Sequence, residues 1–239
     1  MLNTSDDGRT ATITLPGGEL DEATARQLTS VLDSLIEDRA VRVVALVASG
    51  ADFGTGITSG LDPLKVDPDP ASALARLRVP VVAAITGACY DESLEVALAT
   101  DIRVADPSAT FRLAAATEGC IPCWGGSQRL ARAIRPAEAT SMMLLGSTLT
   151  ADRAASLGLI HEVAADARAR TSEIAEQLAG LGPLALEFAK EAVHRGSEMP
   201  LRDGLRLEGD LNHLLAATDD RAEGLAAFFD KRPPDFSGR

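Results

Sequence analysis

The stretch VPVVAAITGACYDESLEVALATD, residues 79–101, decides the fold of this 239-residue chain. Its first part, Val79 to Ile85, is apolar and rich in valine, which is typical of a β-strand buried on both faces. The turn Thr86-Gly87 ends that strand. Apolar residues then recur with helical spacing, so a helix is predicted from Glu92 to Thr100. The stretch therefore predicts one strand–turn–helix unit of an α/β protein.

The same alternation of strands and helices extends toward the N-terminus. Arg9 to Leu15 alternates threonine with apolar residues, which predicts a half-buried strand. Asp21 to Glu37 has the apolar spacing of a helix, and Val41 to Val47 predicts a second strand buried on both faces. Together they predict a β-α-β unit in a layered arrangement. Further along we expect a loop over 51–70, a short helix over 72–77 and short strands over 102–105 and 110–113.

After Gly125 the pattern changes to a succession of helices. The predicted helices are 127–134, 136–145, 151–157, 168–179, 184–194, 201–216 and 219–229. Pro136, Pro183 and Pro200 stand where the first turn of a helix tolerates a residue without an N–H. We divide the chain into an α/β core, residues 1–180, and a C-terminal helical region, residues 181–239, whose leucines and phenylalanines are expected to be buried between subunits.

Charge and composition exclude several classes of function. The chain has 35 acidic and 23 basic residues, a net charge of −12, and 3% aromatic residues. Nucleic-acid binding relies on clustered basic side chains and stacking aromatic ones, so nucleic acid is excluded as a main partner. No apolar run is long enough to predict a membrane span, and the N-terminus lacks the apolar segment of a signal peptide. The three cysteines form no even disulfide framework, so we expect a cytoplasmic protein.

Several sequence blocks, in order along nearly the whole chain, resemble the crotonase superfamily, the enoyl-CoA hydratase/isomerase family. They are VRVVALV at 41–47 with DFGTG at 52–56, VPVVAAITG at 79–87, LEVALATD at 94–101, IPCWGGSQRL at 121–130, the segment 149–163, and the closing segment 218–236 with FFDKRP at 228–233. The resemblance implies an α/β fold, a crotonase-like spiral of β-β-α units with a C-terminal helical oligomerisation region. It also implies self-association as a homotrimer or homohexamer.

The resemblance further implies an acyl-CoA thioester as the ligand, with no metal and no cofactor beyond the coenzyme A of the substrate. Chemistry in this family passes through a thioester enolate, whose oxygen is held by two backbone N–H groups, the oxyanion hole. Carried onto this sequence, Thr55, Ile57 and Glu92 bind the substrate, and the N–H groups of Ile57 and Glu92 form the oxyanion hole. Lys231, in the closing segment, is matched to the phosphates of coenzyme A.

The acid/base positions of the family are only partly kept. Glu95 stands at the first, and burial among apolar neighbours should raise its pKa toward neutrality. Ala115 stands at the second, where a glutamate is expected, and Glu118 can replace it only if the local turn brings it round. Asp91-Glu92-Ser93 replaces three glycines. The sequence predicts a hydratase/isomerase-type enzyme with Glu95 and Glu118 as catalytic candidates, and a single carboxylate favours isomerisation over hydration.

Two other classes of function stay open. The alanine at 115 and the replaced glycines also fit a crotonase-like acyl-CoA-binding or structural subunit that has lost its chemistry. Cys120 and Cys123 form a C-x-x-C pair, which suggests a redox protein more weakly, because no thioredoxin-like unit surrounds it. For Glu95 the alternative role is a solvated helix carboxylate. Asp101 is expected to be a structural hydrogen-bond acceptor.

Overall fold

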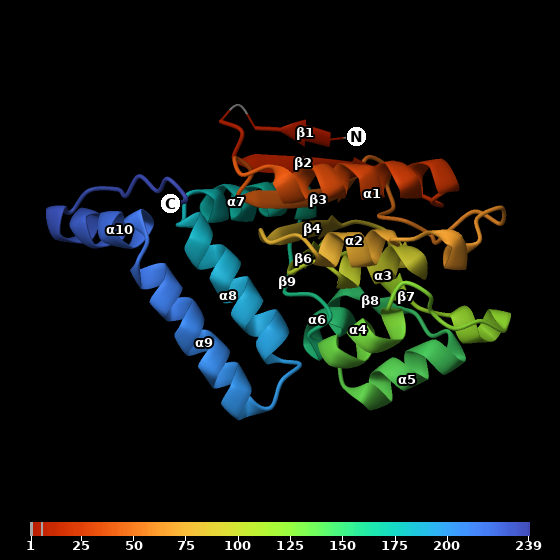
Figure 1. The fold of residues 1–239 in the computed structure, drawn as a ribbon. Helices are drawn as coiled ribbons and strands as arrows, with labels where there is room; N and C mark the ends of the chain where they lie inside the picture. The colour runs from red at the N-terminus through yellow and green to blue at the C-terminus, as the bar shows by residue number, and fades with distance from the viewer. Residues whose placement is uncertain (1, 6) are drawn as a thin grey trace.

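A six-stranded sheet lies at the centre of the molecule (Figure 1) in the computed structural model, which describes residues 2–5 and 7–239. The strand order is β1-β2-β3-β4-β6-β9, with β1 antiparallel to β2 and the other neighbours parallel. The strands are Leu2–Thr4 (β1), Thr10–Leu15 (β2), Val43–Ala48 (β3), Val81–Ile85 (β4), Ile102–Ala105 (β6) and Glu162–Val163 (β9). Because β2, β3, β4 and β6 are parallel, their carboxyl ends share one edge of the sheet.

A second, smaller sheet runs alongside that edge. It is built from Ala88–Tyr90 (β5), Thr110–Arg112 (β7) and Leu149–Thr150 (β8), in the order β5-β7-β8. Single parallel bridges, Gly54 with Cys89 and Leu20 with Ile57, continue the row. Each successive turn of the chain thus adds one strand to the first sheet and one short strand or bridge to the second, which is the predicted spiral.

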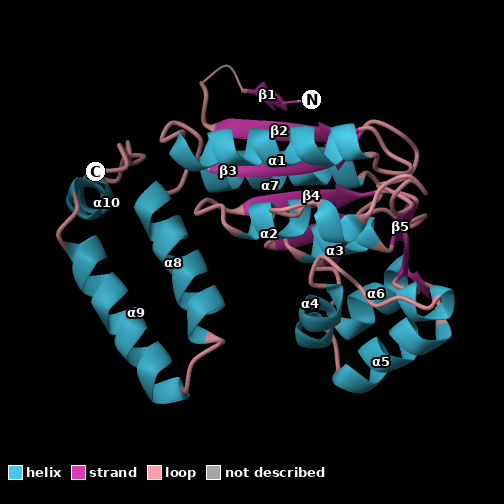
Figure 2. Cartoon of the chain, turned by 45° about the vertical axis from the view of Figure 1, so that its right-hand side comes forward, coloured by secondary structure: helices cyan, strands magenta, loops and turns pink. Residues whose placement is uncertain are grey.

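Helices cover both faces of the main sheet (Figure 2). On one face α7, Ala167–Ala179, packs Ala175 and Ala179 against side chains of β3 and β4. The opposite face belongs to the larger core, which also takes in apolar side chains of α1, Glu22–Glu37, α2, Pro70–Ala75, and α3, Glu92–Leu98. Alternate residues of β3 enter the two cores, so this strand is buried on both faces, as its sequence predicts.

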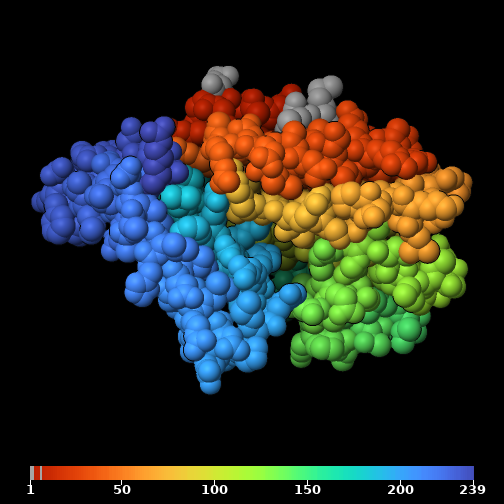
Figure 3. Space-filling model, viewed as in Figure 1, coloured from red at the N-terminus to blue at the C-terminus, as the bar shows by residue number. Residues whose placement is uncertain are grey.

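The remaining helices lie beyond the two sheets. α4, Gly126–Ala133, α5, Pro136–Leu145, and α6, Ala151–Leu157, follow the second sheet, and short 3-10 helices occupy Pro63–Lys65 (η1) and Ala115–Glu118 (η2). The C-terminal helices are α8, Pro183–Gly196, α9, Leu201–Ala216, and α10, Asp219–Asp230. They extend away from the core, and a hollow separates them from the α4–α5 region on the face shown in Figure 3. No helix in the described part of the chain is long and apolar enough to span a membrane.

One buried ion pair ties α8 to the core. The ammonium of Lys190 donates to Asp101 Oδ2 at 2.7 Å and to the carbonyl of Val79 at 2.8 Å. Asp101 Oδ2 also accepts the N–H of Val81 at 2.7 Å, and His194 Nε2 lies 2.8 Å from Oδ1. Burial acts to raise the pKa of Asp101, but these hydrogen bonds and the charge of Lys190 outweigh it and lower the pKa. Asp101 is therefore the structural acceptor that the sequence predicts.

The predicted elements are confirmed to within a few residues at their ends, with three differences. The strands β8 and β9 lie within the half predicted to be helical, and β1 and β5 were not predicted. These segments have two or three residues, too few to show a period of two. Pro200 is the residue before the first turn of α9 rather than a member of that turn.

Candidate active site

Three segments from different parts of the chain meet beside the carboxyl edge of the main sheet. Residues 54–57 follow β3, residues 91–95 follow β5, and residues 120–126 lead into α4. Gly54 bridges Cys89 of β5, which brings the first two segments together. Hydrogen bonds from Trp124 and Gly126 to Glu95 bring in the third. Apart from Lys231, the predicted site residues belong to these segments or to η2.

Glu95 is held inside the protein by the segment before α4. Its side chain is 1% exposed, and its Oε1 accepts the N–H of Trp124 at 2.9 Å and the N–H of Gly126 at 2.6 Å. Trp124 is also buried, and its indole N–H donates to the carbonyl of Pro63 at 3.2 Å. A Cβ at position 126 would lie 2.8 Å from Glu95 Cγ, so only glycine fits there. The alternative of a solvated carboxylate is therefore wrong for Glu95.

The environment of Glu95 places its proton exchange near neutral pH. Burial raises its pKa to about 7, the N–H groups of Gly126 and Trp124 act to lower it, and the neighbouring Glu92 charge raises it. The expected shift toward neutrality is thus confirmed. A carboxyl group with such a pKa both accepts and returns a proton at neutral pH, as a general acid–base catalyst must.

The amino end of α3 packs directly on residues 54–57. Ser93 Oγ accepts the N–H of Gly56 at 3.4 Å, and it lies 2.2 Å from where a Cβ at Gly54 would be. Glu92 Oε2 lies 3.3 Å from a Cβ built at Gly56, whose φ is +102°. Glu92 is the first residue of α3, where an N–H has no partner within the helix. In the described residues the N–H of Ile57 donates to no backbone carbonyl.

Glu92 also brings a second carboxyl group into the site. Burial raises its pKa, and the charges of Asp91 and Glu118 raise it further. Glu118 is exposed at the end of η2, close enough to act on Glu92, whereas it is not among the groups that shift the pKa of Glu95. Glu118 thus lies within electrostatic range of Glu92 but not of Glu95. From the sequence, Glu92 is assigned a role through its N–H, and whether its carboxyl group or that of Glu118 replaces the missing second glutamate stays open.

Asp91 adopts a backbone conformation that normally belongs to glycine. Its φ is 51° and its ψ is −120°, the region of the first central residue of a type II′ turn. Its two carboxylate oxygens accept from the N–H of Ala114 at 2.8 Å and from Arg112 Nη2 at 2.7 Å. Its own N–H donates to the carbonyl of Arg112 at 2.8 Å, and the guanidinium lies 4.7 Å from the Tyr90 ring centroid. These bonds hold Asp91 in a conformation that glycine adopts without strain.

Cys123 of the C-x-x-C pair has an environment opposite to that of a reactive thiol. Cys120 is exposed and Cys123 half-buried, and both are free. Burial and the charges of Glu95 and Glu92 raise the pKa of Cys123, whereas a redox-active thiol needs a lowered pKa. In residues 2–5 and 7–239 no three metal-ligating side chains converge.

Lys231 lies apart from the other predicted site residues. It is exposed just after α10, which lies at the opposite end of the molecule from α3 (Figure 1). The adjacent Arg232 is paired with Glu223, with nitrogen–oxygen distances of 2.6 and 2.8 Å. Within one chain, therefore, the structure brings together Glu92, Glu95, Glu118 and the 54–57 segment, but not Lys231.

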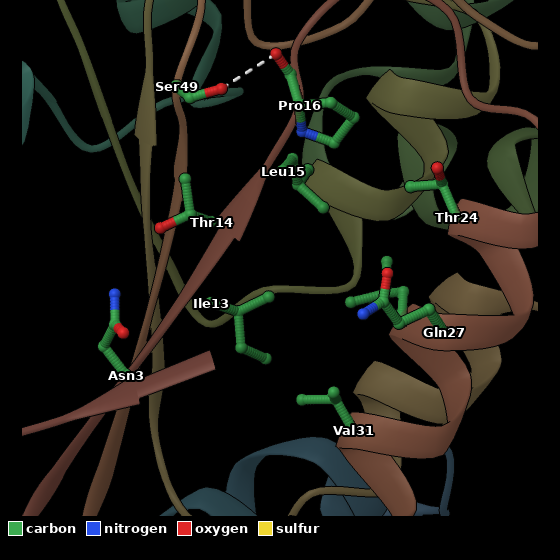
Figure 4. Close-up of a pocket in the computed structure, with 10 residues that line it drawn as sticks. Asn3, Ile13, Thr14, Leu15, Pro16, Thr24, Gln27, Val31 and Ser49 are labelled. Carbon is green, nitrogen blue, oxygen red and sulfur yellow. Dashed lines mark hydrogen bonds between the residues drawn. The ribbon is translucent and has the colours of Figure 1, made fainter. Parts of the chain in front are cut away.

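A cavity of about 460 Å³ between β2 and α1 contains none of these residues (Figure 4). Asn3, Thr24, Gln27 and Ser49 are among its polar lining residues, and Ser49 Oγ donates to the carbonyl of Pro16 at 2.9 Å. Its lining holds no acidic, basic or thiol side chain, so it lacks the groups that proton transfer needs. Such groups are present at the edge where Glu92 and Glu95 lie.

Comparison with known proteins agrees with this geometry. The enoyl-CoA hydratase/isomerase family model matches residues 16–239. A 2,3-dehydroadipyl-CoA hydratase from Escherichia coli (strain K12) is 35% identical over 230 residues, which cover 92% of this chain and 90% of that protein. A probable enoyl-CoA hydratase from Rhizobium meliloti (strain 1021) is 36% identical over 248 residues, 97% of this chain and 96% of that protein.

The solved structures agree as well. The crystal structure of an enoyl-CoA hydratase from Bacillus anthracis superimposes with a TM-score of 0.91 at 30% identity, over 100% of this chain and 99% of that one. The match covers both the spiral core and the C-terminal helices. The chain therefore belongs to the enoyl-CoA hydratase/isomerase family of the crotonase superfamily.

Proposed function

We propose that this chain is an enoyl-CoA hydratase that adds water across the 2,3 double bond of an acyl-CoA. Family membership supports an acyl-CoA hydratase-type function, and the relatives described above carry hydratase names. The observation that carries the proposal is the placement of Glu95, buried, bonded to two backbone N–H groups and coupled to the Glu92 carboxyl. A pair of carboxyl groups is what hydration needs and what the loss of glutamate at Ala115 seemed to remove.

In the proposed mechanism the N–H groups of Ile57 and Glu92 bind the thioester oxygen, beside Thr55. One carboxyl group of the Glu92–Glu95 pair takes a proton from the water that attacks the β-carbon. Electrons move through the double bond onto the thioester oxygen, which becomes an enolate held by the two N–H groups. The other carboxyl group, which is protonated, gives its proton to the α-carbon. Because two neighbouring carboxylates resist ionising together, the pair naturally holds one proton.

Glu92 fits the second acid/base role better than Glu118. Its carboxyl oxygen lies against Gly56, next to Ile57, and it acts directly on the pKa of Glu95. A protonated Glu92 also removes the repulsion that a charged group would exert on an enolate. Glu118 is exposed, and its charge affects the pKa of Glu92 but not that of Glu95. We therefore assign it the role of raising the pKa of Glu92. Isomerisation through Glu95 alone is the second candidate activity.

Self-association and coenzyme A binding are proposed together. Large apolar residues of α9 and α10 are exposed in the single chain, among them Leu201 at 77%, Phe228 at 76% and Phe229 at 76%. Covering them between copies supports a homotrimer or homohexamer. Such an assembly would carry Lys231 toward the site of a neighbouring copy, where its charge suits the phosphates of coenzyme A. The free state of Cys89, Cys120 and Cys123 supports a cytoplasmic location.

The decisive experiment measures water addition to 2-enoyl-CoA substrates of several chain lengths, with 3-enoyl-CoA substrates tested for isomerisation. We expect hydration by the native chain and a fall of about 10²- to 10⁴-fold for Glu95→Gln and for Glu92→Gln, with coenzyme A binding retained. Glu118→Gln is the matched control, because this side chain is exposed; we expect a change of less than about tenfold.

Each alternative has its own outcome in this assay. Turnover of 3-enoyl-CoA alone, lost in Glu95→Gln but kept in Glu92→Gln, would identify an isomerase. Binding of acyl-CoA without turnover of any substrate would identify a binding or structural subunit. Hydration that survives Glu92→Gln but not Glu118→Gln would reverse the assignment of the second carboxyl group.

A further inference from the structure

Arginine side chains gather at the amino edge of the main sheet, opposite the candidate active site. Arg9 directly precedes β2, Arg42 directly precedes β3, and Arg78 stands shortly before β4. These strands are parallel neighbours, with Thr10 opposite Val43 and Val44 opposite Val81, so their amino ends lie side by side. The topology therefore places three guanidinium groups in one row.

The row lines a cavity of about 530 Å³, which we call the arginine cavity. Five arginines contribute to its wall: Arg9, Arg39, Arg42, Arg78 and Arg239. The acidic side chains in the wall are Asp7 and Glu187. Among the described residues, this lining has an excess of three positive side chains. That excess is opposite in sign to the net charge of the chain, which is −12.

Most of the positive charge in the arginine cavity has no acidic partner. Glu187 pairs with Arg78, and Asp7 approaches Arg9 only to 3.7 Å. Arg42 binds two carbonyl groups instead of a carboxylate, at Ala179 and Phe236. Burial lowers the pKa of Arg42, and the neighbouring charge of Arg9 lowers it further, although more distant carboxylates act in the opposite direction.

Two arginines have hydrogen-bonding capacity that the described residues do not use. Arg78 Nε is buried and donates to no group in the described part of the chain. The exposed Arg39 forms no ion pair or side-chain hydrogen bond with residues 2–5 or 7–239. A buried donor without an acceptor is unfavourable, and the exposed guanidinium of Arg39 is accessible to an oxyanion in the cavity.

We propose that the arginine cavity binds a phosphate group, as inorganic phosphate or as the phosphoryl end of a nucleotide. The planar guanidinium fork matches the geometry of phosphate oxygens, and several forks around one cavity favour a multiply charged anion. The site lies at the sheet edge opposite Glu95, so it is separate from the acyl-CoA site. It does not depend on the proposed hydratase activity.

Binding at this place would also join the C-terminal tail to the core. Ser237 and Gly238 line the arginine cavity, and their N–H groups donate to Asp220 of α10 at 2.7 and 3.1 Å. Arg42 holds the carbonyl of Phe236 in the same tail. A phosphate group bound between the strand ends and this tail would therefore stabilise the whole chain against unfolding.

The test is calorimetric titration of the full chain with inorganic phosphate and, separately, with adenosine diphosphate, at low ionic strength. We expect saturable binding with a Kd of about 1 mM or tighter for at least one of them, and a matching rise in melting temperature. Equal affinity for the two identifies the free anion as the ligand. Tighter binding of the diphosphate identifies a nucleotide.

Arg39→Glu is the informative variant, because Arg39 makes no bond whose loss would disturb the fold. It should weaken phosphate binding at least about tenfold while the melting temperature without phosphate stays unchanged. Arg202→Glu is the matched control, since Arg202 is also exposed, lies on α9 and is not in the cavity wall. Absence of saturable binding to the native chain, or equal Kd values for the two variants, would overturn the proposal.

Discussion

Glu95, inside the short helix α3, and Asp101, three residues after its end, are two carboxylates largely withdrawn from solvent, yet the charges around them differ in sign. Burial, together with the charge of Glu92, raises the pKa of Glu95 to about 7, although backbone N–H groups act to lower it. Asp101 meets the ammonium of Lys190 and the ring of His194, and its pKa is lowered. A buried carboxylate paired with a cation holds structure together, whereas one buried beside another acid and without a cation is prepared to exchange a proton.

The largest expected effect comes from breaking the ion pair between Asp101 and Lys190. Asp101→Ala would leave Lys190 buried without its partner, so we expect a loss of about 3 kcal/mol in the free energy of unfolding. Chemical denaturation at neutral pH measures this. Asp33→Ala is the control, because the Asp33–Arg76 pair is exposed and its loss should cost less than about 1 kcal/mol. Equal losses for the two variants would show that the Asp101 pair has no structural role.

The raised pKa of Glu95 should make the free energy of unfolding depend on pH. The pKa of Glu95 is about 7 in the folded chain against an ordinary value of 4.5, so the folded state binds this proton more tightly. The resulting stabilisation is complete below about pH 4.5 and disappears as the pH rises through about 7. Relative to Glu95→Gln, the native chain should lose at most about 3 kcal/mol over that interval.

The contribution of Asp101 to stability changes with pH in the opposite direction. Its pKa is lowered from 3.8, so its contribution is present above that pH and is lost on acidification. Parallel stability curves for the native chain and Glu95→Gln between pH 4.5 and 7 would contradict the shifted pKa of Glu95.

The contact between Glu95 and Gly126 offers a smaller change with a catalytic effect. In Gly126→Ala the added Cβ would lie 2.8 Å from Glu95 Cγ and Oε1, so the carboxylate must move. We expect kcat for enoyl-CoA hydration to fall about 100-fold, since small displacements of a catalytic group have effects of that size. Gly209→Ala is the control, because a Cβ there meets nothing within 4 Å. Undiminished kcat in Gly126→Ala would mean that Glu95 tolerates displacement.

The smallest expected effect tests the bonds that hold the backbone of Asp91. In a residue whose side chain forms no such bonds, a φ of 51° costs about 1 to 2 kcal/mol. Asp91→Ala should therefore lose that much free energy of unfolding, and part of its activity. Asp91→Gly should restore both, because glycine adopts this conformation freely. Melting temperature and kcat of the two variants measure the difference. If Asp91→Gly were less active than Asp91→Ala, the carboxylate of Asp91 would have a role other than holding the backbone conformation.

Much of the fold was predictable because its signals repeat along the sequence. Alternation along β2 and the continuous apolar runs of β3 and β4 predicted which strands are buried on one face and which on both. The short strands β5, β8 and β9 were not predictable, because only their neighbours in the folded chain make them strands. Pairing across long sequence distances defines them, as for Glu162–Val163 beside β6.

The candidate site was predictable in its positions but not in its side-chain directions. The raised pKa of Glu95 followed from its apolar neighbours. That Glu92 turns its carboxyl group toward Gly56 did not follow, because it depends on the packing of Ser93 against Gly54. The distance of Lys231 from α3 was equally hidden, since it results from the direction in which α8 and α9 leave the core.

Trp124, whose N–H binds Glu95, is the single tryptophan of the chain. Emission excited at the red edge of its absorption therefore originates from one buried indole beside the Glu95 carboxylate, with no contribution from other fluorophores. Any event that changes the charge of Glu95 or fills the space beside it alters the field at that ring. The protein thus carries an intrinsic optical reporter of its own acid–base centre, and a titration of native fluorescence would follow Glu95 without label or substrate.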